Sequence, residues 1–197
     1  VMRKYQTPLD ALARRGFFPV IGLELEFYLF GVKDFSDAEI LARLQTAVEP
    51  LRATAPEKEK GPGQFEVALE HRADIASLIV DWSALKDAIT LMAEECGGEV
   101  CFDPCPIPDA PGSGLHLHLH LMDAEGQNLY QRDSSGEYSE LLRHSLGGIL
   151  KYLPEKMLCY APTEASYGRF APTHNAPATI SWGPNNRSVA VRLPDKP

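Results

Sequence analysis

The sequence predicts an α+β fold in which helices pack on the apolar face of a curved, mainly antiparallel sheet. Three segments alternate polar and apolar residues, which is typical of strands with one buried face: residues 22–30, 64–70 and 115–121. Two intervening segments, residues 36–48 and 74–95, carry apolar residues at helical spacing. Strands that present one apolar face need a covering layer, and these helices supply it.

Composition limits the classes of protein to which this chain can belong. With 197 residues and 44% hydrophobic content, we expect one domain with a sizeable core. A formal net charge of -8 argues against sequence-independent binding to nucleic acid or to an anionic membrane, because binding to either needs a basic surface. The four cysteines form no C-x-x-C pair, which favours free thiols in a reducing compartment. Since the first residues lead into no long apolar run, we expect a cytoplasmic protein whose partners are small molecules or proteins.

Residues 22–30 form an apolar run that is interrupted by two acids. In a strand, Glu24 and Glu26 share one face while apolar side chains fill the other. Burying two carboxylates is costly unless a cation or hydrogen-bond donors compensate, so the pair predicts a positive partner. The alternative is that the face carrying Glu24 and Glu26 is simply exposed to solvent.

The segment that follows combines a helix, a turn and a second strand. Ser36 and Glu39 form a capping box that begins the first long helix. A charged connector and a turn at residues 57–63 then lead to the strand 64–70. In that strand Glu66 lies on the polar face, which repeats the arrangement of the first strand.

The clearest alternation in the chain lies in residues 115–121. His116, His118 and His120 share one face, and four leucines share the other. Imidazoles beside glutamates indicate a surface for a metal or a phosphate, and a His-x-His pair can supply two zinc ligands from one strand. Carboxylates outnumber imidazoles here, which favours Mg²⁺ or Mn²⁺, because these ions prefer oxygen ligands. An exposed polar strand face is the alternative.

The remaining segments add two helices and several arginines. Residues 9–15 predict one or two helical turns, and residues 137–152 predict a longer helix. Arg169 lies in a loop, and the last strand, residues 187–194, turns Arg192 toward the same polar face as the glutamates and histidines. Arginines there could hold phosphate or carboxylate oxygens, although an ordinary surface cation is the alternative. The sequence has no Walker loop, and such a face suits divalent ions bound together with the phosphates of a nucleotide.

Five segments that cover nearly the whole chain share a recognisable order and spacing. They are Gly22-Leu23-Glu24-Leu25-Glu26-Phe27, Gly61-Pro62-Gly63-Gln64-Phe65-Glu66, Gly112-Ser113-Gly114-Leu115-His116-Leu117-His118, Ser166-Tyr167-Gly168-Arg169-Phe170 and Asn186-Arg187-Ser188-Val189-Ala190-Val191-Arg192-Leu193-Pro194. Together they resemble the catalytic domain of the glutamine synthetase family. The residues around Trp182-Gly183 resemble the γ-glutamyl-amine ligase branch of that family more closely than its ammonia-using members. The resemblance implies an incomplete catalytic domain over residues 1–197, without the family's N-terminal β-grasp domain and without the Arg-x-Glu-x-Arg segment that follows the last strand.

The resemblance also implies two metal sites on the polar sheet face. One ion is bound in the family by the second acid of the Glu-x-Glu pair and two later glutamates, which match Glu26, Glu59 and Glu66. The other ion is bound by residues that match Glu24 and His116, together with the glutamate of the Arg-x-Glu-x-Arg segment.

Further residues match positions around ATP and the acid substrate. His118 matches a nucleotide-phosphate contact, and Arg187 and Arg192 match the arginines that bind the nucleotide and stabilise the transferring phosphoryl group. Arg169 matches a contact to the substrate carboxylate, and Gly112 matches backbone that approaches the amino-acid substrate. The resemblance therefore implies that Arg187 and Arg192 are catalytic.

The function implied by the resemblance is a carboxylate-amine ligase of nitrogen metabolism that uses ATP with Mg²⁺ or Mn²⁺. In this family the γ-carboxylate of glutamate attacks ATP to give an acyl phosphate, and an amine then displaces phosphate to give a γ-glutamyl amide. The implied partners are glutamate or a related acid, an amine and ATP, with a homo-oligomer or a partner chain that supplies the N-terminal domain. The alternative is a non-catalytic metal- and nucleotide-binding or regulatory module, since the short chain alone leaves activity open.

Four positions depart from the family pattern. Pro111 replaces a usual Asn before Gly-Ser-Gly, His120 replaces a usual Ser, and Ala165 replaces the Asn before Ser-Tyr. Asn175 stands where ammonia-using members have a glutamate that helps to deprotonate the incoming ammonium. An amide cannot act as that base, so we do not expect ammonia to be the acceptor.

Overall fold

The computed structural model describes residues 2–170 and 176–194, with the side chains of the first helix from residue 8 onward. Its contacts divide the chain into two compact units. The first unit consists of Val1–Cys101 with Leu115–Gln131, and the second consists of Phe102–Gly114 with Arg132–Pro197. In the described part of the chain, no helix is both long enough and apolar enough to cross a membrane.

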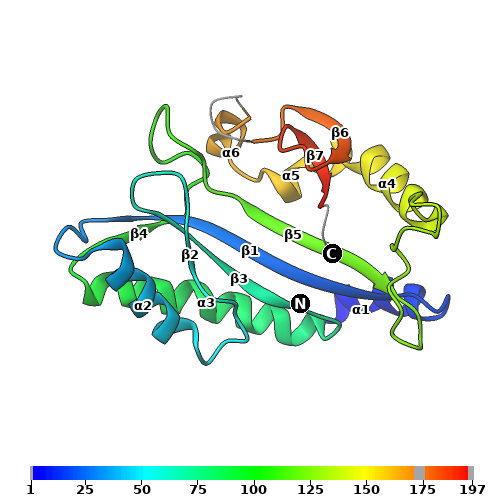
Figure 1. Cartoon of the computed structure of the whole chain (residues 1–197), viewed down its shortest axis with the longest axis horizontal. Coiled ribbons are helices and arrows are strands. Elements are labelled where there is room, and N and C mark those ends of the chain that lie inside the picture. Colours follow the sequence, from blue (N-terminus) through cyan, green and yellow to red (C-terminus); the bar gives the residue numbers. More distant parts are fainter. Residues whose placement is uncertain (1, 171–175, 195–197) are drawn as a thin grey trace. The chain divides into compact units, whose positions relative to one another are not determined.

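The first unit is built on an antiparallel sheet of five strands. The central strand β1 (Phe18–Phe30) pairs along one edge with β3 (Gln64–Arg72), which pairs in turn with the short β2 (Glu57–Lys58). Along its other edge, β1 pairs with β5 (Leu115–Met122) and then with β4 (Glu99–Cys101), as Figure 1 shows. This antiparallel sheet with its helices confirms the fold class that the sequence predicts.

The described residues of the first unit form three helices: α1 (Met2–Ala13), α2 (Asp37–Val48) and α3 (Ile75–Glu95). Figure 1 shows α2 and α3 along one face of the sheet. The core of this unit contains apolar side chains that are almost completely buried, among them Phe27, Leu44, Phe65, Leu85 and Ile89. These side chains come from β1, β3 and both helices, so the alternating strands and the helical stripes meet as expected.

The sequence predicted the long elements more closely than the short ones. The capping box of α2 is present: Ser36 Oγ accepts a hydrogen bond from the Glu39 N–H, and the Glu39 carboxylate accepts one from the Ser36 N–H at 2.8 Å. Helix α1 is longer than the predicted turns and includes Pro8, which lacks a backbone N–H. The strands β2 and β4 were not predicted, because two or three residues are too few to show an alternation.

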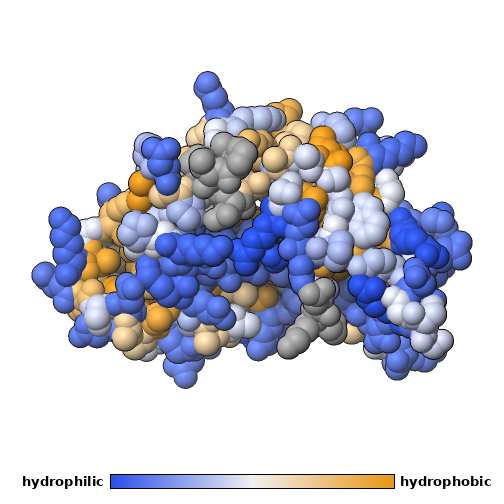
Figure 2. All heavy atoms as spheres, turned by 45° about the horizontal axis from the view of Figure 1, so that its top comes forward, coloured by the Kyte–Doolittle hydropathy of each residue, from blue (hydrophilic) through white to orange (hydrophobic). Residues whose placement is uncertain are grey.

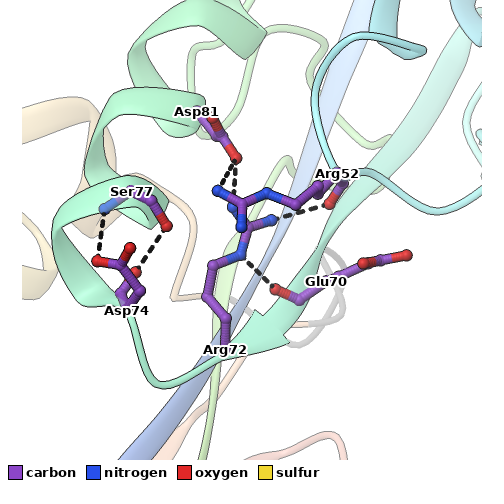
Figure 3. A network of polar contacts seen from close by, with 6 residues as sticks. All are labelled: Arg52, Glu70, Arg72, Asp74, Ser77 and Asp81. Carbon is purple, nitrogen blue, oxygen red and sulfur yellow. Dashed lines mark hydrogen bonds and ion pairs between the residues drawn. The ribbon is translucent and has the colours of Figure 1, made fainter.

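Arg72 fastens the end of β3 to α3 (Figure 3). Its guanidinium forms an ion pair with Asp81 of α3, and it donates hydrogen bonds to the backbone oxygens of Arg52 at 2.9 Å and Glu70 at 3.2 Å. A second cation joins this carboxylate, because Arg52 Nη2 lies 3.4 Å from Asp81 Oδ2. Since the buried Arg72 is held on the helix side of the sheet, the preceding His71 faces the opposite, polar side.

The apolar face of β5 is less covered than the sequence predicted. Leu115, Leu117 and Leu119 are 52%, 57% and 37% exposed, whereas Leu121 is buried. Strand β5 pairs with β1 alone among the described strands, so it lies at an edge of the sheet. The helices of this unit thus leave most of the apolar face of β5 exposed, because an alternating pattern identifies the two faces of a strand but not whether the strand lies at the edge.

The second unit contains short helices and a separate two-stranded sheet. Its helical elements are α4 (Glu140–Tyr152), η1 (Pro154–Lys156), α5 (Met157–Tyr160) and α6 (Glu164–Gly168). Several aromatic and aliphatic side chains of this unit are exposed, among them Tyr160, Leu158 and Trp182. Figure 2 shows apolar side chains, in orange, reaching the surface of the molecule among the more extensive polar ones, in blue.

The last two strands do not extend the sheet of the first unit within the described residues. Strands β6 (Thr179–Pro184) and β7 (Val189–Leu193) pair with each other in parallel. The expectation that Arg192 shares a sheet face with the glutamates and histidines is therefore wrong. Alternation in residues 187–194 identified a strand correctly, but it carries no information about the partner with which the strand pairs.

Candidate metal centre

The polar face of the first-unit sheet brings acids and an imidazole together. Glu24 of β1 lies opposite His116 of β5, and Glu26 lies opposite Glu66 of β3. Directly opposite residues in an antiparallel pair point to the same face, with their Cβ atoms about 5 Å apart. The pairing register of three strands therefore gathers these four side chains in one place.

Both carboxylate oxygens of Glu24 are engaged by imidazoles. His116 Nδ1 lies 2.7 Å from Oε1 of Glu24, and His118 Nε2 lies 2.8 Å from Oε2. Burial by itself raises the pKa of Glu24, but hydrogen bonds to His116, His118 and Glu66 outweigh it, so the pKa of Glu24 lies well below its ordinary value. Glu24 is therefore ionised across the whole physiological range of pH.

Glu66 has the opposite electrostatic character. Burial, a hydrogen bond to Glu24 and the negative charges of Glu24, Glu26 and Glu59 raise the pKa of Glu66 to about 9. In the absence of a cation, Glu66 therefore carries a proton at neutral pH. A proton on Glu66 would let its carboxyl group donate a hydrogen bond to the ionised Glu24.

The turn after β2 positions Glu59 beside these strands. The Glu59 N–H donates to the backbone oxygen of Gln64 at 3.0 Å, and the Gly61 N–H donates to Oε1 of the buried Gln64 at 2.9 Å. Gly63 adopts a φ of 76°, a left-handed conformation that favours glycine. The Gly61-Pro62-Gly63 turn thus folds the connector back onto β3, which explains why Glu59 reaches Glu66.

Two clusters of possible metal ligands result. Glu24, Glu66 and His116 have ligand atoms within 4.8 Å of one another, and so do Glu26, Glu59 and Glu66. Glu66 belongs to both clusters, whereas the sequence placed it with Glu26 and Glu59 alone. His116 keeps Nε2 available beside these acids, at 3.9 Å from Oε1 of Glu26.

The donor set fits a hard divalent cation. Carboxylate oxygens dominate both clusters, and Mg²⁺ and Mn²⁺ prefer oxygen ligands with few nitrogens. Burial, and then the neighbouring acids, raise the pKa of Glu66, and a bound cation would offset the charge of these carboxylates in place of a proton.

A histidine that the sequence pattern did not indicate, His71, lies on the polar face of the same sheet. The ring of His71, at the end of β3, is 5.4 Å from the ring of His118 and 6.0 Å from that of His120, measured between ring centroids. His71 lies over Gly22, where any Cβ would collide with the imidazole. A register shift between β1 and β3 at this point moves His71 into place, and a pattern of strict alternation does not reveal such a shift.

Partial desolvation also affects the imidazoles. It lowers the pKa of His71, with a smaller contribution from the neighbouring His118 and His120, and burial lowers the pKa of His120. Both rings are therefore neutral at and above neutral pH.

The other residues named from the sequence belong to the second unit. Gly112 and Arg169 lie together there, because a Cβ on Gly112 would be 2.5 Å from the Pro104 oxygen and 2.8 Å from Arg169 Nε. Arg187 and Arg192 are both exposed. Asn175 lies outside the described residues.

An antiparallel sheet with helices on one face and clustered carboxylates on the other defines an α+β protein with an acidic sheet face. The model for the catalytic domain of glutamine synthetase matches residues 38–197. The chain therefore belongs to the glutamine synthetase family.

Several curated proteins resemble the chain over nearly its full length. The gamma-glutamylputrescine synthetase PuuA of Escherichia coli is 34% identical over 218 residues, which cover 93% of this chain and 45% of PuuA. The glutamine synthetase of Pyrococcus furiosus is 32% identical over 206 residues, which cover 94% of this chain and 46% of that protein. The chain thus spans a little less than half the length of these relatives.

Solved structures share the fold. A structure described as a novel glutamine synthase homolog has a TM-score of 0.79 at 27% identity, covering 95% of this chain and 47% of its own. A structure described as a GmaS/ADP complex has a TM-score of 0.76 at 26% identity, and the match covers 95% of this chain and 50% of that one. The glutamine synthetase of Plasmodium falciparum has a TM-score of 0.80, and the match covers 97% of this chain and 47% of that one. At 18% sequence identity, this likeness supports the fold alone.

Proposed function

We propose that this chain forms the metal-binding portion of an ATP-dependent carboxylate-amine ligase of the glutamine synthetase type. The observation that carries the proposal is the pair of ligand clusters that share Glu66, one with Glu24 and His116 and the other with Glu26 and Glu59. Membership of the family supports the reaction class.

In the proposed reaction, the γ-carboxylate of an acid such as glutamate attacks the γ-phosphorus of ATP and releases ADP. An amine then displaces phosphate from the acyl phosphate and loses a proton to give the amide. Glu26, Glu59 and Glu66 would hold one Mg²⁺ or Mn²⁺, and Glu24, Glu66 and His116 a second. When bound, such ions neutralise charge on the phosphoryl oxygens.

This chain's own residues have complementary roles in the proposal. Glu24 holds the imidazole of His118 by a 2.8 Å hydrogen bond, and in the proposal that ring contacts a nucleotide phosphate. Arg187 and Arg192 carry fixed positive charges for the transferring phosphoryl group. Arg169, beside Gly112, would bind the carboxylate of the acid substrate bidentately.

We further propose an organic amine rather than ammonia as the acceptor. Asn175 offers an amide where an ammonia-using enzyme needs a base, and γ-glutamylputrescine synthetase is among the similar proteins. The proposal includes a cytoplasmic location, which fits a chain whose four cysteines form no C-x-x-C pair. It also includes a homo-oligomer or a partner chain that completes the active site.

The test measures Mn²⁺-dependent ATP binding by the purified chain and then phosphate release with glutamate and a panel of amines. Phosphate release that requires both glutamate and an amine would support the ligase. Binding of Mn²⁺ and ATP without turnover would favour a non-catalytic module, an alternative that the replacements at Pro111 and Ala165 motivate. If the chain binds neither Mn²⁺ nor ATP, both the proposed ligase and the non-catalytic binding module are wrong.

A further inference from the structure

We propose that His71, His118 and His120 form a site for a transition metal such as Zn²⁺ next to the carboxylate clusters, a site that shares His118 with the proposed nucleotide contact. The proposed ligase function needs neither His71 nor His120, and it uses oxygen-rich ligand sets. The imidazole cluster has a different chemistry, because neutral ring nitrogens prefer Zn²⁺, Ni²⁺ or Cu²⁺ over Mg²⁺.

The distances from the His71 ring to the other two rings are close to those between imidazoles on one bound ion. With Zn–N bonds of about 2 Å, two imidazoles on a tetrahedral ion have ring centres about 5 Å apart. The centroid of the His71 ring lies 5.4 Å from that of His118 and 6.0 Å from that of His120. His71 therefore lies at ligand distance from both rings of the His-x-His pair on β5.

The backbone that presents these rings is well fixed. His118 and His120 lie opposite Gly22 and Val20 in the β1–β5 register, so both project from the polar face. His71 reaches this pair across Gly22, the position at which a side chain would block it. On the other face of β3, the ion pair between Arg72 and Asp81 keeps the strand end in this orientation (Figure 3).

His118 has the second partner that metal-binding histidines usually have. Its Nε2 lies 2.8 Å from the Glu24 carboxylate, which leaves Nδ1 as the ligand atom. A carboxylate that accepts from one ring nitrogen fixes the tautomer and raises the basicity of the other.

Binding requires the rings to turn. Among residues 2–170 and 176–194, only the two carboxylate clusters have ligand atoms that already lie within 4.8 Å of one another. The terminal torsion of a histidine side chain is soft, so such a rotation is inexpensive. His71 is exposed to solvent, which leaves an open path for the ion.

The test titrates the chain with Zn²⁺ by calorimetry in excess Mg²⁺, which occupies the carboxylate clusters. We expect one Zn²⁺ per chain, with affinity lowered at least about tenfold in His71→Ala and in His120→Ala. His144→Ala removes an exposed histidine of α4 and serves as the matched control, with no change expected. If His71→Ala fails to fold, as judged by circular dichroism, His120→Gln on the edge strand provides the same test.

Two results would overturn the proposal. One is the absence of Zn²⁺ binding by the wild-type chain, and the other is an affinity for Zn²⁺ that the His71 and His120 variants leave unchanged. Mn²⁺ binding measured on the same variants separates this site from the proposed function. We expect His71→Ala to bind Mn²⁺ as the wild type does, because its ring belongs to neither carboxylate cluster.

Discussion

Glu24 and His116 lie opposite each other in the β1–β5 pair, and Nδ1 of His116 is 2.7 Å from Oε1 of Glu24. The imidazoles of His116 and His118 lie within hydrogen-bonding distance of the two oxygens of this carboxylate, while burial and the neighbouring acids raise the pKa of Glu66 beside it to about 9. A cation that uses Glu66 as a ligand must displace a proton from its carboxyl group. Metal binding at this face is therefore linked to proton release.

The first prediction follows from this linkage. The affinity for Mn²⁺ should rise between about pH 7 and 9, because the pKa of Glu66 is raised to about 9 and fewer protons then need to be displaced. Calorimetry in two buffers of different ionisation enthalpy measures the protons released per ion. An affinity and a heat that are independent of pH and buffer would contradict the pKa assigned to Glu66.

The second prediction concerns stability in the absence of divalent cations. The folded state keeps a proton on Glu66, with a pKa of about 9, that the unfolded chain releases near the ordinary value of 4.5. The free energy of unfolding should therefore fall as the pH rises from about 7 to 9. The lowered pKa values of His71 and His120 affect stability only below their ordinary value of 6.5, so they do not disturb this window.

Thermal unfolding of Glu66→Gln is the control for that prediction. A glutamine cannot titrate, so the variant should lose this component of the pH dependence. If the unfolding temperature of the variant falls with pH as steeply as that of the wild type, another group is responsible.

The third prediction compares two ways of altering the network at Asp81. Asp81→Ala leaves the buried guanidinium of Arg72 without its carboxylate and should cost about 3 kcal/mol of stability. Arg52→Ala removes a cation that is 56% exposed and should cost less than about 1 kcal/mol. Chemical denaturation measures both values, and equal losses would mean that Arg72 does not depend on Asp81.

The fourth prediction uses two glycines in different surroundings. A Cβ at Gly98 would collide with the Phe30 carbonyl oxygen and the Val32 side chain, so Gly98→Ala should destabilise the chain by about 1–3 kcal/mol. Gly147 lies inside α4 with open space around it, and Gly147→Ala should stabilise by about 0.5–1 kcal/mol. The same sign for both variants in denaturant titrations would contradict the close packing of Gly98 against β1.

Much of the first unit was predictable because its signals are local. Alternation in residues 22–30, 64–70 and 115–121 identified three strands, and the capping box at Ser36 identified the start of α2. The faces of Glu24, Glu26 and Glu66 followed from the period of two alone. That these acids meet depends on register, which the resemblance to a family supplied and the residue pattern did not.

What escaped prediction depends on contacts between distant segments. The partner of β7 and the exposure of the β5 leucines depend on which strand lies beside which. The position of His71 depends on a shift of register opposite Gly22. That Glu66 belongs to both ligand clusters depends on distances between three strands. A single sequence contains no direct signal for any of these relationships.

The most direct test of the account is the equilibrium binding of Mn²⁺, measured by calorimetry or electron paramagnetic resonance on the wild type, Glu59→Gln and Glu66→Gln. Because Glu66 belongs to both clusters and Glu59 to one, we predict two ions for the wild type, weakening of one in Glu59→Gln and weakening of both in Glu66→Gln. A wild-type chain that binds no Mn²⁺, or a Glu66→Gln variant that binds Mn²⁺ as tightly as the wild type, would contradict the account.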